Sequence, residues 1–173
     1  MNIYIKPYIV ENEKKRIFIV HGICEHSGRY KELAEAFNKE GFSVITYDLR
    51  GHGKSSGKPG YVKRFQDHID DLSKVIRGND NKAVKRYILG HSLGGLIGHI
   101  YMTTNKEKID GFIASGAPTG YLKSVKPLTK IGYRWFGFLS VKNNFANGTL
   151  SRDTKIEEEY RGNGREKANW GGV

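Results

Sequence analysis

A serine held between two glycines is the residue of this sequence best placed for covalent chemistry. The segment GHSLG, residues 90–94, follows an apolar run and precedes apolar residues that recur at helical spacing. The pattern G-x-S-x-G between a strand and a helix is typical of a serine nucleophile in a strained turn, because side chains at Gly90 and Gly94 would collide with neighbouring backbone. We therefore predict that Ser92 is a nucleophile. The alternative is a tight turn with an incidental serine.

A serine nucleophile also needs backbone N–H groups directed at the negative charge that develops on the substrate oxygen. The N–H of Leu93 follows the serine at the start of the predicted helix. A second donor is expected from a loop after an earlier strand. The segment IVHGICEHSGRY, residues 19–30, supplies that loop, with the N–H of Ile23 as the candidate. We interpret His21 and His26 as residues that hydrogen-bond within this loop rather than as catalytic groups.

The elements that must position these groups follow from the apolar pattern. Apolar runs alternate with helical patterns before Pro118, which predicts an α/β fold with a mostly parallel sheet flanked by helices. One helix lies between the first two strands, with Ser27 as its cap and Gly41 as its stop, and another starts at Ser92 or just after it. A third covers residues 65–76, with three aspartates toward its start, where the helix dipole favours them. The predicted strands are residues 17–20, 42–48, 86–90 and 111–115.

The composition excludes several classes of protein. With 38% hydrophobic and 27% charged residues, the chain has the composition of an ordinary globular protein. No run approaches the roughly 18 apolar residues of a membrane span, and the first residues lack the order of a signal peptide, so we expect a cytoplasmic location. Cys24 is the only cysteine, which excludes an internal disulfide, and the six histidines show no metal-ligand spacing. We predict no metal and no cofactor.

The net charge of +11 raises the question of nucleic-acid binding. The lysines are scattered rather than clustered and no nucleic-acid motif accompanies them, so we predict no nucleic-acid partner. The glycine-rich segment DLRGHGKSSGKPG, residues 48–60, fails the phosphate-binding pattern because Pro59 follows its Gly-Lys pair. We interpret it as a compact polar loop after a strand.

Three segments in this order, HGICEHSGRY, DLRGHGKSSG and GHSLGG, resemble the monoacylglycerol lipase group of α/β-hydrolases. These proteins are also described as lysophospholipase-like or serine-aminopeptidase-like hydrolases. The resemblance covers residues 4–161. It implies an α/β-hydrolase core with a cap inserted after the sixth strand, Ser92 as nucleophile, and Ile23 and Leu93 as oxyanion donors.

The resemblance also implies a site for the head group of the substrate. In this family the segment that matches residues 21–30 lines the polar end of the acylglycerol pocket. Glu25, Arg29 and Tyr30 are therefore expected to contact the head group. Cys24 stands where glycine is common in the family.

The partners that would activate the serine are the main departure from the family pattern. A histidine base and a carboxylate are needed, and in this fold they follow the serine in the chain. The only histidine after Ser92 is His99, and seven residues of helix, about 10 Å, separate the two. We expect His99 not to reach the hydroxyl, and both the C-terminal strands and the acid and base to be missing. Without a base, catalysis should fall by about 10⁴- to 10⁶-fold.

We therefore expect a partial α/β-hydrolase core at residues 1–118, a partial cap or lid at residues 119–161 and an atypical tail at residues 162–173. The predicted function is hydrolysis of single-chain carboxylic esters, such as monoacylglycerols or lysophospholipids, through an acyl-enzyme on Ser92. Two alternatives stay open. One is an inactive pseudoenzyme or lipid-binding remnant, and the other is a peptidase or acyltransferase of the same fold.

The predicted cap carries an aromatic segment with a basic rim, VKPLTKIGYRWFGFLSVK, residues 125–142. One interpretation is a helix that faces the core and has solvated lysines. The other is a peripheral membrane contact, because aromatic side chains with surrounding positive charge suit an anionic lipid surface. In that case the segment would admit a single acyl chain to the pocket above Ser92.

Overall fold

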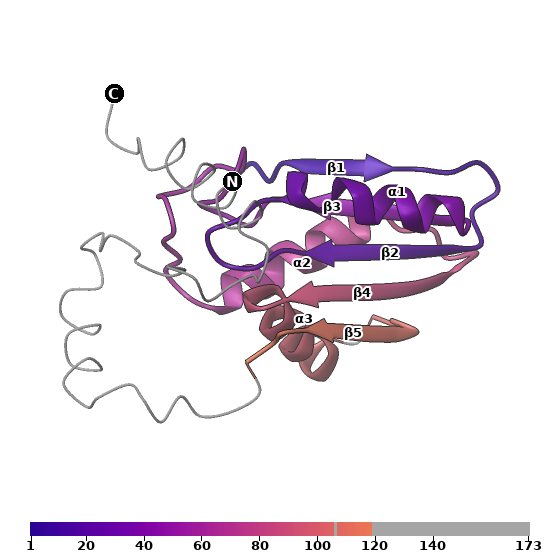
Figure 1. The fold of residues 1–173 in the computed structure, drawn as a ribbon. Coiled ribbons are helices and arrows are strands. Elements are labelled where there is room, and N and C mark those ends of the chain that lie inside the picture. The colour runs from indigo at the N-terminus through magenta and orange to yellow at the C-terminus, as the bar shows by residue number, and fades with distance from the viewer. Residues whose placement is uncertain (106, 119–173) are drawn as a thin grey trace. The chain divides into compact units, whose positions relative to one another are not determined.

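A five-stranded sheet organises the described part of the chain, residues 1–105 and 107–118 of the computed structural model. The strand order is β1-β3-β2-β4-β5 (Figure 1). The β1 strand is antiparallel to β3, and every other neighbouring pair is parallel, which confirms the predicted α/β class with a mostly parallel sheet. The strands are β1 (Ile5–Tyr8), β2 (Lys15–Val20), β3 (Phe42–Tyr47), β4 (Lys85–His91) and β5 (Gly111–Ser115).

Helices cover both faces of this sheet (Figure 1). Along β2 the side chains of Ile17 and Ile19 pack on the face that α1 covers, and Phe18 and Val20 pack on the face that α2 and α3 cover. This alternation is the two-residue period of a strand that is buried on both sides. The helical elements are η1 (Ser27–Tyr30, a 3₁₀ helix), α1 (Lys31–Lys39), α2 (Gln66–Gly78) and α3 (Leu93–Thr104).

The four predicted strands and three predicted helices are confirmed to within two or three residues. The structure differs from the sequence-based prediction at two other points, a fifth strand and a helix cap. The β1 strand was missed, because its short sequence IKPY contains a proline and its residues are mostly half-buried. The helix cap predicted at Ser27 is wrong. His26 caps η1 by accepting the N–H of Gly28 at 3.1 Å, and the N–H of Ser27 instead donates to Asp48.

The stop predicted at Gly41 is confirmed. Its φ of +79° is a left-handed conformation that glycine adopts without a steric cost. Its N–H donates to the carbonyl of Asn38 at 2.9 Å, which closes the end of α1. The chain then turns directly into β3, the strand whose C-terminal loop forms part of the site below.

The chain divides into two compact units, Met1–Pro118 and Thr119–Val173. The second unit lies outside the described residues. The cap at residues 119–161, the tail at residues 162–173 and the lipid contact at residues 125–142 therefore stay predictions. In the first unit, no described helix is long and apolar enough to cross a membrane.

Candidate active site

Ser92 lies in the turn between β4 and α3, in a strained backbone conformation. Its φ is +50° and its ψ is −116°. Such a conformation costs a residue with a side chain about 1 to 3 kcal/mol, and it persists only where the surroundings enforce it. The N–H of Ser92 donates to the carbonyl of Ser115 at 2.9 Å, and its carbonyl accepts the N–H of Gly95 at 3.0 Å. The end of β5 and the first turn of α3 thus hold the serine in place.

The glycines around Ser92 are required by close contact between backbones. A Cβ atom on Gly94 would collide with the carbonyl groups of Val20 and His21, and one on Gly90 would collide with the carbonyl of Gly94. The start of α3 therefore lies directly against the end of β2. This contact explains why a helix with two glycines in its first turn is tolerated here despite their low helix propensity.

The loop after β2 contacts the serine from the other side. A Cβ atom built on Gly22 would lie 3.1 Å from the Cβ of Ser92 and 3.3 Å from Cδ2 of His91. The segment that carries Ile23 is therefore beside the candidate nucleophile. Within the described residues, neither the Ile23 N–H nor the Leu93 N–H makes a hydrogen bond, so both are available as donors.

His21 fixes this loop and cannot act as the base. Its Nε2 accepts the N–H of Leu49 at 2.9 Å, so the proton lies on Nδ1, which donates to the carbonyl of Gly22 at 2.7 Å. Burial lowers the pKa of His21 to about 3, although the Gly22 carbonyl favours the protonated form. The ring is neutral and both nitrogens are occupied. The predicted hydrogen-bonding role of His21 is confirmed.

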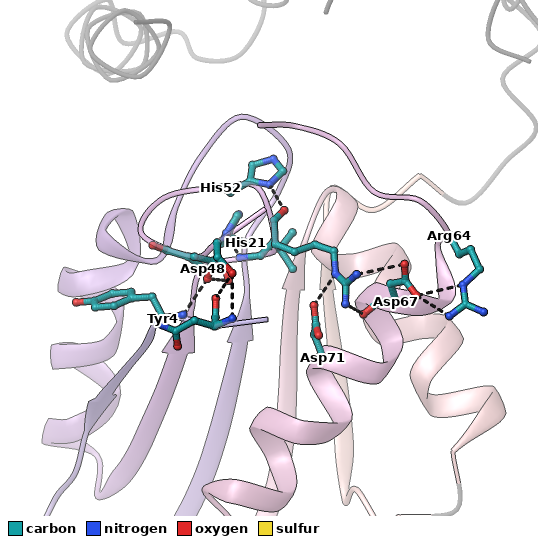
Figure 2. A network of polar contacts seen from close by, with 12 residues as sticks. Tyr4, His21, Asp48, His52, Arg64, Asp67 and Asp71 are labelled. Atoms are coloured by element: carbon teal, nitrogen blue, oxygen red, sulfur yellow. Dashed lines mark hydrogen bonds and ion pairs between the residues drawn. The ribbon is translucent and has the colours of Figure 1, made fainter. Parts of the chain in front are cut away.

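Asp48, the first residue after β3, ties the same loop to the glycine-rich segment that follows it (Figure 2). Its Oδ1 accepts the N–H of Ser27 at 2.7 Å, and its Oδ2 accepts the N–H of Lys54 at 2.7 Å. Burial would raise the pKa of the Asp48 carboxyl, but these two N–H groups outweigh it and hold the pKa below its usual value. The carboxylate is thus a structural acceptor, and the glycine-rich segment is the compact loop that the sequence predicts.

Glu25, Arg29 and Tyr30, the predicted head-group residues, come together in one cluster. The Glu25 carboxylate accepts the Tyr30 hydroxyl at 2.9 Å and the Arg29 guanidinium at 3.2 Å, and it also accepts the N–H of Gly22. All three residues border a cleft of about 320 Å³. Its lining also includes Leu33, Leu89 and His91. The cleft therefore combines this polar cluster with apolar side chains.

All six histidines of the sequence lie among the described residues, and none forms a hydrogen bond with the Ser92 hydroxyl there. His99 is exposed on α3 and, as expected, forms no hydrogen bond with the Ser92 hydroxyl within the described residues. His91 has its Nδ1 3.4 Å from the Ser115 hydroxyl, and His68 is buried on α2. No group of three His, Cys, Asp or Glu residues able to hold a metal ion occurs in the same region.

An ion-pair cluster that was not predicted from the sequence anchors α2 to the loop after β3. The Arg50 Nε donates to Asp71 at 2.7 Å, and a second guanidinium nitrogen lies 3.2 Å from Asp67 (Figure 2). The helix dipole alone does not account for these aspartates, because Asp71 lies beyond the first turn and is 2% exposed. The four-residue spacing of Asp67 and Asp71, which places both on one helix face, was the available signal.

The fold and the strained serine turn define an α/β-hydrolase. Residues 11–164 match the family described as serine aminopeptidase, S33, and the chain belongs to this family of serine hydrolases, which includes lipases and esterases. The monoacylglycerol lipase of Mycolicibacterium smegmatis is 30% identical over 151 residues, which cover 84% of this chain and 54% of that protein. Phospholipase YtpA of Bacillus subtilis is 33% identical over 105 residues, which cover 60% of this chain and 40% of that protein.

Solved structures support the same assignment. The crystal structure of a monoacylglycerol lipase from Paleococcus ferrophilus has a TM-score of 0.77 and 31% identity, over 93% of this chain and 62% of that one. A monoglyceride lipase from Saccharomyces cerevisiae, at 20% identity and a TM-score of 0.75, shares the fold over 90% of this chain and 56% of that one. The chain thus spans about half the length of the relatives it matches.

Proposed function

We propose that this chain carries the nucleophile and oxyanion hole of a serine hydrolase that cleaves single-chain lipid esters. One observation carries the proposal. Ser92 is held at a φ of +50° between β4 and α3 while Gly22, from the loop after β2, packs against its side chain. This arrangement places Ser92 beside the loop that carries Ile23, and among the described residues the N–H groups of Ile23 and Leu93 have no hydrogen-bond acceptor.

In the proposed reaction the Ser92 oxygen attacks the ester carbonyl carbon. The carbonyl oxygen becomes an oxyanion that accepts hydrogen bonds from the N–H groups of Ile23 and Leu93. The C–O bond to the alcohol then breaks, the alcohol leaves with a proton, and the acyl group stays on Ser92 until water releases it as a carboxylic acid. No histidine of these 173 residues is placed to carry the proton, so both steps should be slow in this chain.

The substrate class is inferred from the relatives and from the cleft. The names of several relatives refer to monoacylglycerol, monoglyceride or phospholipid substrates, all of which are lipid esters. The cleft is lined by the apolar side chains of Leu33 and Leu89 as well as by Arg29 and Tyr30, which suits a substrate that has both an apolar and a polar part.

Mass spectrometry after incubation with p-nitrophenyl butyrate tests the proposal. We expect slow addition of one butyryl group, mapped to Ser92, with no appreciable steady-state turnover. Ser92→Ala should remove the adduct, and Ser115→Ala, a matched change at a serine that lines the cleft, should keep it. An adduct that persists in Ser92→Ala would contradict the assignment of the nucleophile. Turnover like that of an intact esterase would contradict the absence of a base.

The lack of a placed histidine favours one second candidate, a lipid-binding protein without chemistry. Such a protein would bind a monoacylglycerol equally well before and after Ser92→Ala and would form no adduct with any ester. A peptidase or acyltransferase of the same fold would instead be recognised by transfer from an amide substrate, or to an alcohol acceptor, in the same assay.

A further inference from the structure

Gly22 is held at both of its backbone polar groups by buried side chains. Its carbonyl accepts Nδ1–H of His21 at 2.7 Å, and its N–H donates to the Glu25 carboxylate. Glu25 is 9% exposed, so this hydrogen bond is shielded from water. A backbone fixed on both sides cannot rotate freely about φ and ψ.

The conformation of Gly22 sets the direction of the Ile23 N–H. The two groups of one peptide unit point in opposite directions, because the bond is planar and the described residues contain no cis peptide. Since the Gly22 carbonyl points at the His21 ring, the Ile23 N–H points away from that ring. Gly22 itself lies against the Ser92 side chain, with only 3.1 Å between the Ser92 Cβ and a Cβ built on Gly22.

The acceptor sites of Glu25 are already occupied by the protein. One oxygen accepts both the Gly22 N–H and the Tyr30 hydroxyl, and the other pairs with Arg29 at 3.2 Å. Burial and the adjacent Glu25 carboxylate raise the pKa of Tyr30, so the phenol stays protonated and remains a donor. A carboxylate with these three partners has little capacity left for a substrate hydroxyl.

We propose that Glu25 is a positioning residue: with Arg29 and Tyr30 holding its carboxylate, it fixes the Gly22–Ile23 segment so that the Ile23 N–H faces the oxyanion. This role rests on the proposed function and replaces the head-group contact that the family resemblance implies for Glu25. It predicts an effect of Glu25 on every ester, whatever its alcohol group. A head-group contact would affect only esters that carry a glycerol-like group.

Two activated esters with the same acyl group separate these roles. Both p-nitrophenyl butyrate and S-butyryl thioglycerol leave a butyryl group on Ser92, and only the second has a glycerol-like leaving group. For Glu25→Ala we expect the acylation rate at saturating ester to fall about 100-fold with both, the size of the loss of one oxyanion donor, at an unchanged half-saturation concentration. Glu25→Gln, whose amide oxygen can still accept the Gly22 N–H, should stay within tenfold of the wild type. Glu32→Ala, at an exposed carboxylate on α1, is the matched control and should change neither the acylation rate nor the half-saturation concentration for either ester.

Amide hydrogen exchange gives a readout that does not depend on the chemistry. The Gly22 N–H should exchange faster in Glu25→Ala and at nearly the wild-type rate in Glu25→Gln and Glu32→Ala. Loss limited to the thioglycerol ester, or unchanged Gly22 exchange in Glu25→Ala, would overturn the positioning role. If the wild type forms no adduct at all but Gly22 exchange responds as described, the proposed function is wrong. The hydrogen bond by which Glu25 fixes this loop is then still supported.

Discussion

At the scale of single residues, the site depends on backbone conformations that most side chains avoid. Ser92 has a φ of +50° and Cys24, in the loop after β2, has a φ of +59°. The strain at Ser92 belongs to the turn that carries the candidate nucleophile, whereas the strain at Cys24 lies in the neighbouring loop. The left-handed conformation of Cys24 also explains why glycine suits position 24, since glycine adopts this conformation without the steric cost of a Cβ atom.

Replacing Cys24 with glycine should therefore stabilise the protein. Relief of left-handed strain gains about 1 to 2 kcal/mol, and the extra freedom of glycine in the unfolded chain offsets part of it. We expect the free energy of unfolding in urea to rise by up to about 1 kcal/mol. Cys24→Ser, which keeps a Cβ atom, is the control and should bring no gain. A less stable Cys24→Gly protein would refute the strain argument.

At the scale of secondary structure, what sequence predicts depends on how local the cause is. The strands from β2 to β5 were predicted from short apolar runs, and the three α-helices were predicted from apolar residues that recur at helical spacing. The strained turn at Ser92 was predicted because two flanking glycines mark it. The Arg50 cluster was not, since it joins a loop to a helix about twenty residues away and leaves only a weak local pattern. The partners of Glu25 likewise emerged only from the folded loop.

The Arg50 cluster should contribute measurably to stability. Asp71→Asn weakens a nearly buried, charge-assisted hydrogen bond from Arg50, and such bonds are worth about 1.5 to 3 kcal/mol. We expect a loss of that size in urea unfolding. Asp70→Asn, one residue away on the exposed face of α2, removes a carboxylate whose one hydrogen bond among the described residues is from Gln66, and it should change stability by less than about 0.5 kcal/mol. Equal effects of the two substitutions would rule out a specific role for the cluster.

At the scale of the whole molecule, two buried histidines make the fold sensitive to acid. Burial lowers the pKa of His21 to about 3 and that of His68 to about 4. In the unfolded chain both titrate near pH 6.5. Between pH 6.5 and 4 the unfolded chain therefore binds more protons than the folded one, and the free energy of unfolding falls as the pH falls.

Each histidine should contribute up to about 1.4 kcal/mol per pH unit in this range. Urea unfolding at a series of pH values should show the decline, and His68→Gln should make it shallower. His99→Gln, at the exposed histidine of α3, should leave the slope unchanged. A free energy of unfolding that stays constant or rises between pH 6.5 and 4 would contradict the assignment of neutral buried rings.

The edge of the sheet should govern association between molecules. In the described part of the chain β5 pairs only with β4, and Ile113 on β5 is 46% exposed. An uncovered strand with an exposed apolar side chain promotes pairing with another copy. We expect concentration-dependent association in sedimentation experiments, and Ile113→Lys should reduce it. A monomer at all concentrations would show that this edge is protected in solution.

The most direct test of the account uses an alkylboronic acid, which forms a tetrahedral adduct with a serine hydroxyl and mimics the oxyanion intermediate. The central claim is that Ser92 and the N–H groups of Ile23 and Leu93 are preorganised even though, in the described part of the chain, no histidine forms a hydrogen bond with the Ser92 hydroxyl. Boron NMR should show a tetrahedral adduct with the wild-type chain, and Ser92→Ala should abolish it. Boron that stays trigonal with the folded wild-type protein, or an adduct that survives Ser92→Ala, would contradict the account.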